Sequence, residues 1–203
     1  MKLYDFTMAP NPRRVRIFMV EKGVEVPMVQ VNLMTAENRQ PPFLAKNPMG
    51  GVPVLELDDG TLISESVAIC RYFEEQKPEP PLMGVDAKDR AVVEMWNRRL
   101  ELNLLFTVAS VFRHLHPAMK EMEQPQVPQW AEANKPRVLD FLTLLDAQLK
   151  GRPYVTGTDF TVADITGLVA IDLMKPAKLG VPDHLLQVRR WHAEVSLRPS
   201  ASA

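Results

Sequence analysis

The sequence predicts a small α/β domain followed by an all-helical domain, and three observations lead to this prediction. Up to residue 75, short strand-like segments are interspersed with segments of helical periodicity. A proline-rich stretch, Gln76–Pro81, then interrupts the pattern. Everything after Asp86 has the apolar spacing of helices. We therefore expect domains at 1–76 and 87–203, joined by a linker at 77–86.

Composition limits the function classes. A chain of 203 residues can bury one large or two small cores, and its net charge of -1 favours neither nucleic acid nor a membrane surface. The single cysteine, Cys70, excludes an intrachain disulfide and is typical of a reducing compartment. The N-terminus lacks the apolar segment of a signal peptide, and no apolar run is long enough to span a membrane. We expect a cytoplasmic protein with no nucleic-acid or membrane partner.

In the first domain, residues 3–6 and the alternating residues 29–33 are expected to be strands. Between them a helix is expected to begin at Asn11, which can cap it, with proline next and Gly23 as its end. A loop or short helix over 41–46 follows. The order strand, helix, strand, irregular helix, strand, strand, helix predicts one mixed sheet with helices on its faces.

The segment 50–66 is the most informative part of the chain. It contains two short strands joined by an Asp-Asp-Gly turn, with Pro53 before the first and a helix that begins at Glu65 and Ser66. A proline beside a strand often has a cis bond in a tight bend. A helix that begins with an acid and a hydroxyl has free backbone N–H groups for a carboxylate. This segment predicts a surface that binds a small zwitterionic peptide.

The second domain is expected to contain four helices, of which the first carries a long apolar stripe. The first helix is expected over 87–115, and the second from a proline-rich break at 124–128 to about 149. The third and fourth are expected over 165–173 and 186–195. Pro136 is expected to kink the second helix or to mark a late start. Thr161-Val162-Ala163-Asp164 is a capping-box pattern that predicts the start of the third.

Four motifs follow one another along the chain: Asn47-Pro48-x-Gly50-x-Val52-Pro53, Asp59-Gly60, Glu65-Ser66-x-Ala68-Ile69 and Phe160-Thr161-Val162-Ala163-Asp164-Ile165. In this order they resemble the cytosolic glutathione transferase family, its bacterial, theta- and nu-like members in particular. The likeness extends from Met1 to about Pro199. It implies a thioredoxin-like domain that binds glutathione and a helical domain that supplies most of the second-substrate pocket. It also implies a detoxification enzyme, glutathione as co-substrate with no other cofactor, and a homodimer.

The resemblance implies a role for each residue of the peptide-binding segment. Val52, before a cis Pro53, would pair its backbone with the cysteinyl unit of glutathione, as in strand addition. Glu65 would accept from the α-ammonium of the γ-glutamyl end, and Ser66 with its amide would bind the carboxylate there. The alternative is that Pro53 is an ordinary turn proline and that Glu65 and Ser66 only begin a helix.

The residue that activates the sulfur is less obvious, because Ala9 stands where theta-like relatives place a serine, and alanine cannot donate. Asn11 matches an asparagine of some bacterial and fungal members, and its amide could donate to a thiolate. The helix N-terminus would also stabilise the thiolate, since thiols there have pKa values well below the free value of about 8.5. Asn11 as helix cap and Asn11 as sulfur ligand both remain open. Thr7, the nearest hydroxyl, is the second candidate.

The expected reaction is addition of the glutathione thiolate to an apolar electrophile. Phe106 and Phe112 are candidates for the second-substrate pocket, although aromatic residues on a helix are more often core. His114 and His116 diverge by about 200° on a helix, so no metal site is expected. Two alternatives remain open: glutathione-dependent reduction of disulfides or peroxides, and a non-catalytic glutathione-binding protein, which Ala9 would favour.

Overall fold

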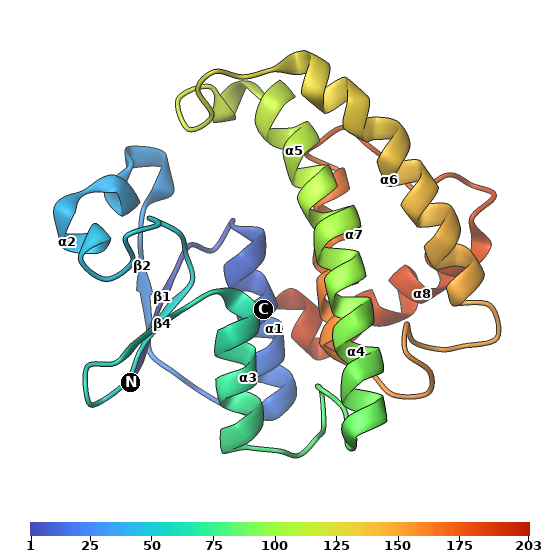
Figure 1. Ribbon diagram of the computed structural model, residues 1–203, viewed down its shortest axis with the longest axis horizontal. Helices are drawn as coiled ribbons and strands as arrows, with labels where there is room; N and C mark the ends of the chain where they lie inside the picture. Colours follow the sequence, from blue (N-terminus) through green and yellow to red (C-terminus); the bar gives the residue numbers. More distant parts are fainter. The chain divides into compact units, whose positions relative to one another are not determined.

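The structure is a computed structural model that describes residues 1–203. The chain divides into two compact units, residues 1–82 with 202–203, and residues 83–201. The first contains all four strands and helices α1 to α3, and the second contains helices α4 to α8 (Figure 1). This composition confirms the predicted fold class of an α/β domain followed by an all-helical domain.

The sheet of the first unit has the strand order β2-β1-β3-β4. Its strands are β1 (Lys2–Asp5), β2 (Met28–Gln30), β3 (Val54–Glu56) and β4 (Leu62–Ser64). β1 pairs in parallel with β2 and antiparallel with β3, which pairs antiparallel with β4. The sheet is therefore mixed, as the order of elements predicts. A tight turn joins β3 to β4, and Gly60 there has φ 85.

β2 is shorter than the strand expected over residues 29–33. It ends at Gln30 because Asn32 starts a new local structure. The Asn32 side chain accepts hydrogen bonds from the N–H groups of Met34 and Thr35, which begins a short 3₁₀ turn at Leu33. A short polar side chain that bonds the backbone two residues on competes with strand pairing.

Helix α1 (Pro10–Lys22) begins one residue before Asn11, and its N-cap is Ala9. No side chain caps it, so the prediction that Asn11 is the helix cap was wrong. Pro10 is itself suited to the first helical turn because its φ is fixed near the helical value. The end of the helix at Gly23 is confirmed: φ is 56 there and the Gly23 N–H donates back into the last turn.

The core of the first unit lies between the sheet and the helices α1 and α3 (Ser66–Gln76), which lie side by side (Figure 1). A short helix, α2 (Pro41–Leu44), follows β2. The most deeply buried large side chains come from the strands and from both longer helices: Leu3, Phe18, Leu55, Ile69 and Phe73. Burial of each such side chain contributes about 1.5 to 3 kcal/mol, so this packing fixes both helices to the sheet.

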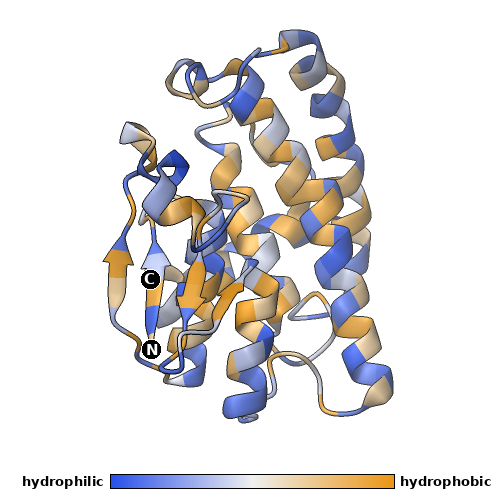
Figure 2. Ribbon diagram, turned by 60° about the vertical axis from the view of Figure 1, so that its left-hand side comes forward, coloured by the Kyte–Doolittle hydropathy of each residue, from blue (hydrophilic) through white to orange (hydrophobic).

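The second unit is built around α7, whose residues are nearly all buried. Its helices are α4 (Ala87–Leu100), α5 (Phe106–Leu115), α6 (Pro128–Gln148), α7 (Val162–Met174) and α8 (Leu186–Ser196). α7 packs against α4, α5 and α8. Along the helices around it, hydrophobic and hydrophilic segments alternate, as expected of amphipathic helices (Figure 2).

The single helix expected over 87–115 is interrupted by a π-helical turn, Glu101–Leu105, although the ribbon runs on from α4 into α5 (Figure 1). A π turn inserts one extra residue and so shifts the helical phase. Leu104 and Leu105 are both buried here, whereas Leu102 is exposed. Apolar periodicity does not reveal this insertion, because the leucines at 100, 102, 104 and 105 do not fall on a single helical face.

α6 begins at Pro128 and continues through Pro136, so a late start at this proline is excluded. Pro136 is exposed, so water can reach the carbonyl group that has lost its helical donor. The capping box at Thr161–Asp164 is confirmed in both of its hydrogen bonds. None of the helices is long and apolar enough to cross a membrane.

Candidate functional site

Strand register places three predicted site segments at one edge of the sheet. Val54 of β3 pairs with Tyr4 of β1 on one side and with Ser64 of β4 on the other. Because both pairings are antiparallel, the residues before β3 lie next to those that follow β1 and β4. Val52 and Pro53 thus lie beside Glu65 and Ser66, and Thr7 follows β1 at the same edge.

The bend before β3 is held by asparagine side chains. Asn38 Nδ2 donates to the Gly50 carbonyl (2.7 Å) and Asn47 Nδ2 to the Gly51 carbonyl (2.9 Å). Gly50 has φ 64, and a Cβ there would lie 3.1 Å from the Asn38 carbonyl oxygen, so a side chain would strain the backbone and crowd this oxygen. These contacts explain the Asn47 and Gly50 positions of the first motif.

Val52 follows this bend, and its backbone N–H and C=O groups can form hydrogen bonds with a ligand. The Val52–Pro53 bond is cis, as predicted. The backbone N–H and C=O of Val52 have no hydrogen-bond partner in the chain, although the residue is half-buried. A donor and an acceptor on one extended residue are what an added strand requires.

The N-terminus of α3 presents unpaired backbone amides. Glu65 precedes the helix with φ 70, and the first helical bond runs from Ile69 N to the Glu65 carbonyl (3.0 Å). The N–H groups of residues 66–68 therefore have no helical partner. The Glu65 side chain is exposed, whereas the Ser66 hydroxyl is buried and accepts from Arg14 Nη1 (3.1 Å). The arrangement offers three amides and a hydroxyl beside one carboxylate.

At the start of α1, Asn11 is the second residue of the first turn and is exposed. Its side chain has no hydrogen-bond partner in the chain, so it is free to bind another group. Because Pro10 and Pro12 have no N–H, Asn11 supplies the only backbone donor among residues 10–12. This helix end differs from that of α3 in presenting one amide rather than three.

Thr7, the second candidate, is already engaged. Its backbone N–H and its hydroxyl both donate to Gln30 Oε1, at 3.1 and 3.0 Å. A hydroxyl has one hydrogen, so Thr7 would have to leave Gln30 in order to donate to a sulfur atom.

A buried polar network behind Thr7 was not predicted. Arg16 Nη1 lies 2.5 Å from Asp5 Oδ1, Arg16 Nη2 donates to the Thr7 carbonyl (2.9 Å), and Gln30 Nε2 donates to Asp5 Oδ2 (2.6 Å). The network fixes the loop between β1 and α1, beside a hollow of about 420 Å³. Alternation at 29–33 indicates only that Gln30 points away from its apolar neighbours, so the sequence contains no sign of these partners.

The chain's own thiol is not a nucleophile. Burial raises the pKa of Cys70 to about 12, while the charge of Arg14 lowers it only in part. A thiol with such a pKa is protonated at neutral pH and unreactive. Thiol chemistry at this protein therefore depends on a thiol that a ligand brings.

The two aromatic candidates of the helical unit differ in surroundings. Phe106 begins α5 and is 65% exposed, whereas Phe112 is half-buried and packs on the His116 ring at 4.7 Å between centroids. Six residues apart, they point in directions about 120° apart on the helix. The structure does not bring them to one face.

The histidines of this region hold the loop that follows α5. Val127 N donates to His114 Nδ1 (3.1 Å) and Ala118 N to His116 Nδ1 (3.2 Å). No group of three or more His, Cys, Asp or Glu side chains is arranged to hold a metal ion.

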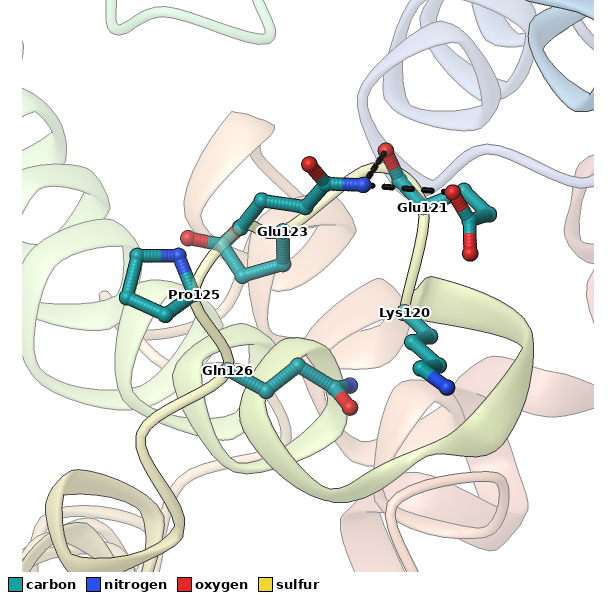
Figure 3. Close-up of a pocket in the computed structure, with 6 residues that line it drawn as sticks. Lys120, Glu121, Glu123, Pro125 and Gln126 are labelled. Atoms are coloured by element: carbon teal, nitrogen blue, oxygen red, sulfur yellow. Dashed lines mark hydrogen bonds between the residues drawn. The ribbon is translucent and has the colours of Figure 1, made fainter.

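A second hollow, of about 240 Å³, lies in the loop between α5 and α6 (Figure 3). Its lining residues are Lys120, Glu121, Glu123, Gln124, Pro125 and Gln126. Gln124 Nε2 donates to the carbonyl oxygen (3.4 Å) and to Oε2 (3.2 Å) of Glu121, drawn as dashed lines. None of the predicted site residues lines this hollow.

Comparison with known proteins identifies the family. Residues 3–81 match the N-terminal domain and residues 109–199 the C-terminal domain of glutathione S-transferases. Glutathione S-transferase 2 of Saccharomyces cerevisiae is 39% identical over 203 residues, which cover 98% of this chain and 87% of that protein.

Solved structures agree. The crystal structure of a glutathione S-transferase domain-containing protein of Marinobacter aquaeolei VT8 superposes with a TM-score of 0.95 at 39% identity, covering 98% of this chain and 99% of that chain. For Gtt2 of Saccharomyces cerevisiae the TM-score is 0.94 at 39% identity, with 98% of each chain covered.

The chain belongs to the glutathione S-transferase family. Its fold is that of the family, a thioredoxin-like domain plus an all-helical domain, and it is a glutathione-dependent transferase. The prediction of the family, the fold and the enzyme class is confirmed. Neither the reductase nor the non-catalytic alternative is favoured by these comparisons.

Proposed function

We propose that the segments at the β1, β3 and β4 edge bind glutathione by its main chain and its ends, and that Asn11 stabilises the thiolate. The observation that carries this proposal is the register of β3. It places the unpaired backbone of Val52 beside the unpaired amides of α3. A γ-linked tripeptide has an amide unit at its centre and a zwitterion at one end, so it matches both features.

Each contact follows from the donors and acceptors present. Val52, next to cis Pro53, donates to and accepts from the cysteinyl unit in the manner of an added strand. The Glu65 carboxylate accepts from the α-ammonium group of the γ-glutamyl end. Ser66 and the first amides of α3 bind the neighbouring carboxylate, which the helix N-terminus also attracts. Hydrogen bonds to charged partners are roughly twice as strong as hydrogen bonds between neutral groups.

The sulfur atom is then stabilised from α1. The Asn11 side chain and its N–H both donate, and both are unpaired in the chain. Donated hydrogen bonds favour the charged form of an acceptor and so lower the pKa of the thiol. The thiolate attacks an electrophile, its lone pair forms the new C–S bond, and the leaving group departs with the electrons of the broken bond. Thr7 remains the second candidate for the donor.

Further properties follow from family membership. Phe106 and Phe112 remain the candidates for the pocket of an apolar electrophile, and because they lie on different faces of α5 we expect only one of them to line it. We expect glutathione to be consumed as a co-substrate with no other cofactor. A two-fold homodimer and a cytoplasmic location complete the proposal. The one buried cysteine is compatible with a reducing compartment.

Glutathione analogues test the contacts at α3. Glutaryl-cysteinyl-glycine lacks the α-ammonium group, and γ-aminobutyryl-cysteinyl-glycine lacks the α-carboxylate. Glu65→Gln should raise the calorimetric Kd for glutathione about tenfold, because a bond to a charged partner contributes about 1.5 kcal/mol or more. The same variant should leave the Kd of the glutaryl analogue unchanged. An equal loss for both ligands would remove Glu65 from ammonium recognition.

A further inference from the structure

Two buried polar pairs connect α1 to α3. Arg14 Nη1 donates to Ser66 Oγ at 3.1 Å, and Lys22 Nζ lies 2.5 Å from Glu74 Oε2. Both partners are displaced by eight residues in the same direction along their helices, so α1 and α3 run parallel and their N-termini lie together (Figure 1). Arg14 is 1% and Ser66 5% exposed. The guanidinium group thus lies beneath the end of α3 that we assign to glutathione.

We propose that Arg14 is a positioning residue that orients the Ser66 hydroxyl toward the γ-glutamyl carboxylate. The inference rests on the proposed function and concerns a residue that does not itself touch the substrate. A serine hydroxyl has one hydrogen and two lone pairs, and arginine can only donate. Ser66 Oγ therefore accepts from Arg14, and its own hydrogen points away from the guanidinium and can be donated to an anion.

The positive charge of Arg14 also favours an anion at the N-terminus of α3. Arginine does not lose its proton in proteins, so this buried charge is permanent. It is close enough to Cys70, one turn further along α3, to lower the pKa of that thiol against the larger effect of burial. A cation near a helix N-terminus opposes the helix dipole, whereas an anion bound there would be favoured by both. The site is therefore pre-organised for a negative group.

Lys22 and Glu74 supply the comparison within the same helix pair. There a carboxylate lies against the lysine, and the lysine also donates to the carbonyl groups of Pro78 and Pro80. At the opposite end of the helix pair, the hydroxyl of a serine, Ser66, accepts from Arg14. A hydroxyl that accepts from the guanidinium keeps its own hydrogen for a ligand, whereas an ionised carboxylate has no hydrogen to donate.

The test measures calorimetric Kd values for glutathione and the two analogues. Arg14→Met should raise the Kd for glutathione and for the glutaryl analogue about tenfold, since a hydrogen bond to a charged group is weakened. The Kd for the γ-aminobutyryl analogue should be unchanged, because it has no α-carboxylate. Ser66→Ala should give the same pattern, and the double variant should lose no more than either single variant. Arg13→Gln removes a positive charge from the preceding position and should change each Kd less than twofold.

Several results would overturn the inference. An equal loss for all three ligands would mean that Arg14 serves packing alone, and no loss would mean that Ser66 is oriented without it. Should Arg14→Met fail to fold, Arg14→Lys takes its place: it keeps the charge, loses the planar fork, and should show the same ligand pattern with a smaller change. Wild-type protein that binds no glutathione would overturn the proposed function itself. If the wild type binds glutathione and the Arg14 variants bind it with the same Kd, only the role of Arg14 is overturned.

Discussion

In the mechanism that we propose, Asn11 brings two donors to the bound thiolate. Its side-chain amide and its N–H are both unpaired, and the prolines on either side contribute no donor. Ala9, at the N-cap, has no donor side chain. The sulfur activation that we propose therefore relies on an amide side chain and one helix-end N–H rather than on a hydroxyl at the position of Ala9.

Replacing Asn11 tests this mechanism. Asn11→Ala should lower kcat/KM and raise the pKa of the bound thiol by about one unit or more, since one unit corresponds to 1.36 kcal/mol of lost thiolate stabilisation. The pH dependence of kcat/KM with an aryl halide electrophile measures both effects. Thr7→Val serves as the comparison and should leave the apparent pKa unchanged. A shift in Thr7→Val with none in Asn11→Ala would exchange the two roles.

The local structure around the proposed site residues was predictable where it depends on near neighbours. Glu65 and Ser66 stand at a helix start that the local pattern reveals, and Pro53 precedes a strand. The cap at Asn11 was mispredicted because asparagine and proline both suit a helix start, and the fixed φ of Pro10 moves that start by one residue. The contact of Arg14 with Ser66 could not be predicted, because the two residues are distant in sequence.

At the scale of elements, Asp164 shows what one side chain does for a helix and its surroundings. Asp164 Oδ2 accepts from the N–H of Thr161 (3.0 Å) within the capping box. Oδ1 accepts from the N–H of Val155 (2.9 Å) and from Trp191 Nε1 (2.8 Å). The first bond could be predicted from the motif, but the other two could not, because their donors lie on other segments.

The titration of Asp164 gives stability a pH dependence. Burial raises the pKa of this carboxyl group to about 6, while the hydrogen bonds from Val155, Trp191 and Thr161 lower it only in part. The folded state binds the Asp164 proton more tightly than the unfolded chain does. The stabilisation of the fold by this protonation is therefore complete below about pH 4 and is lost as the pH rises through about 6. A shift of about two units corresponds to roughly 3 kcal/mol.

Urea unfolding of wild type and Asp164→Asn between pH 4 and 7 checks this expectation. The variant has no group to titrate at this position. The free energy of unfolding of the wild type, minus that of the variant, should therefore fall by roughly 2.5 kcal/mol over this range, which covers most of the titration. A difference that stays constant with pH would show that the carboxyl group is ionised throughout.

The helix boundaries were also predictable in part. The start of α7 at its capping box and the end of α1 at a glycine follow from local chemistry. The π turn at Glu101–Leu105 does not, because it depends on how α4 and α5 each pack in the helical unit. π turns are frequent at functional sites, and Phe106, a proposed pocket residue, follows this one directly.

For the whole molecule, sequence order and motif spacing were sufficient to predict the two-unit architecture and the family. Family membership led us to propose a two-fold dimer. Sedimentation equilibrium should therefore give a mass of 46 kDa, twice that of the 23.0 kDa chain. A particle of 23.0 kDa at micromolar concentration would contradict the dimer and leave the glutathione site unaffected.

Glutathione titration by calorimetry in two buffers of different ionisation enthalpy tests the central claim most directly. We predict one tripeptide per chain, with proton release that reports ionisation of the bound thiol. S-methylglutathione should bind without releasing a proton, because its sulfur cannot ionise. The account is contradicted if millimolar glutathione produces no heat of binding, or if it binds with no proton released below the pKa of the free thiol.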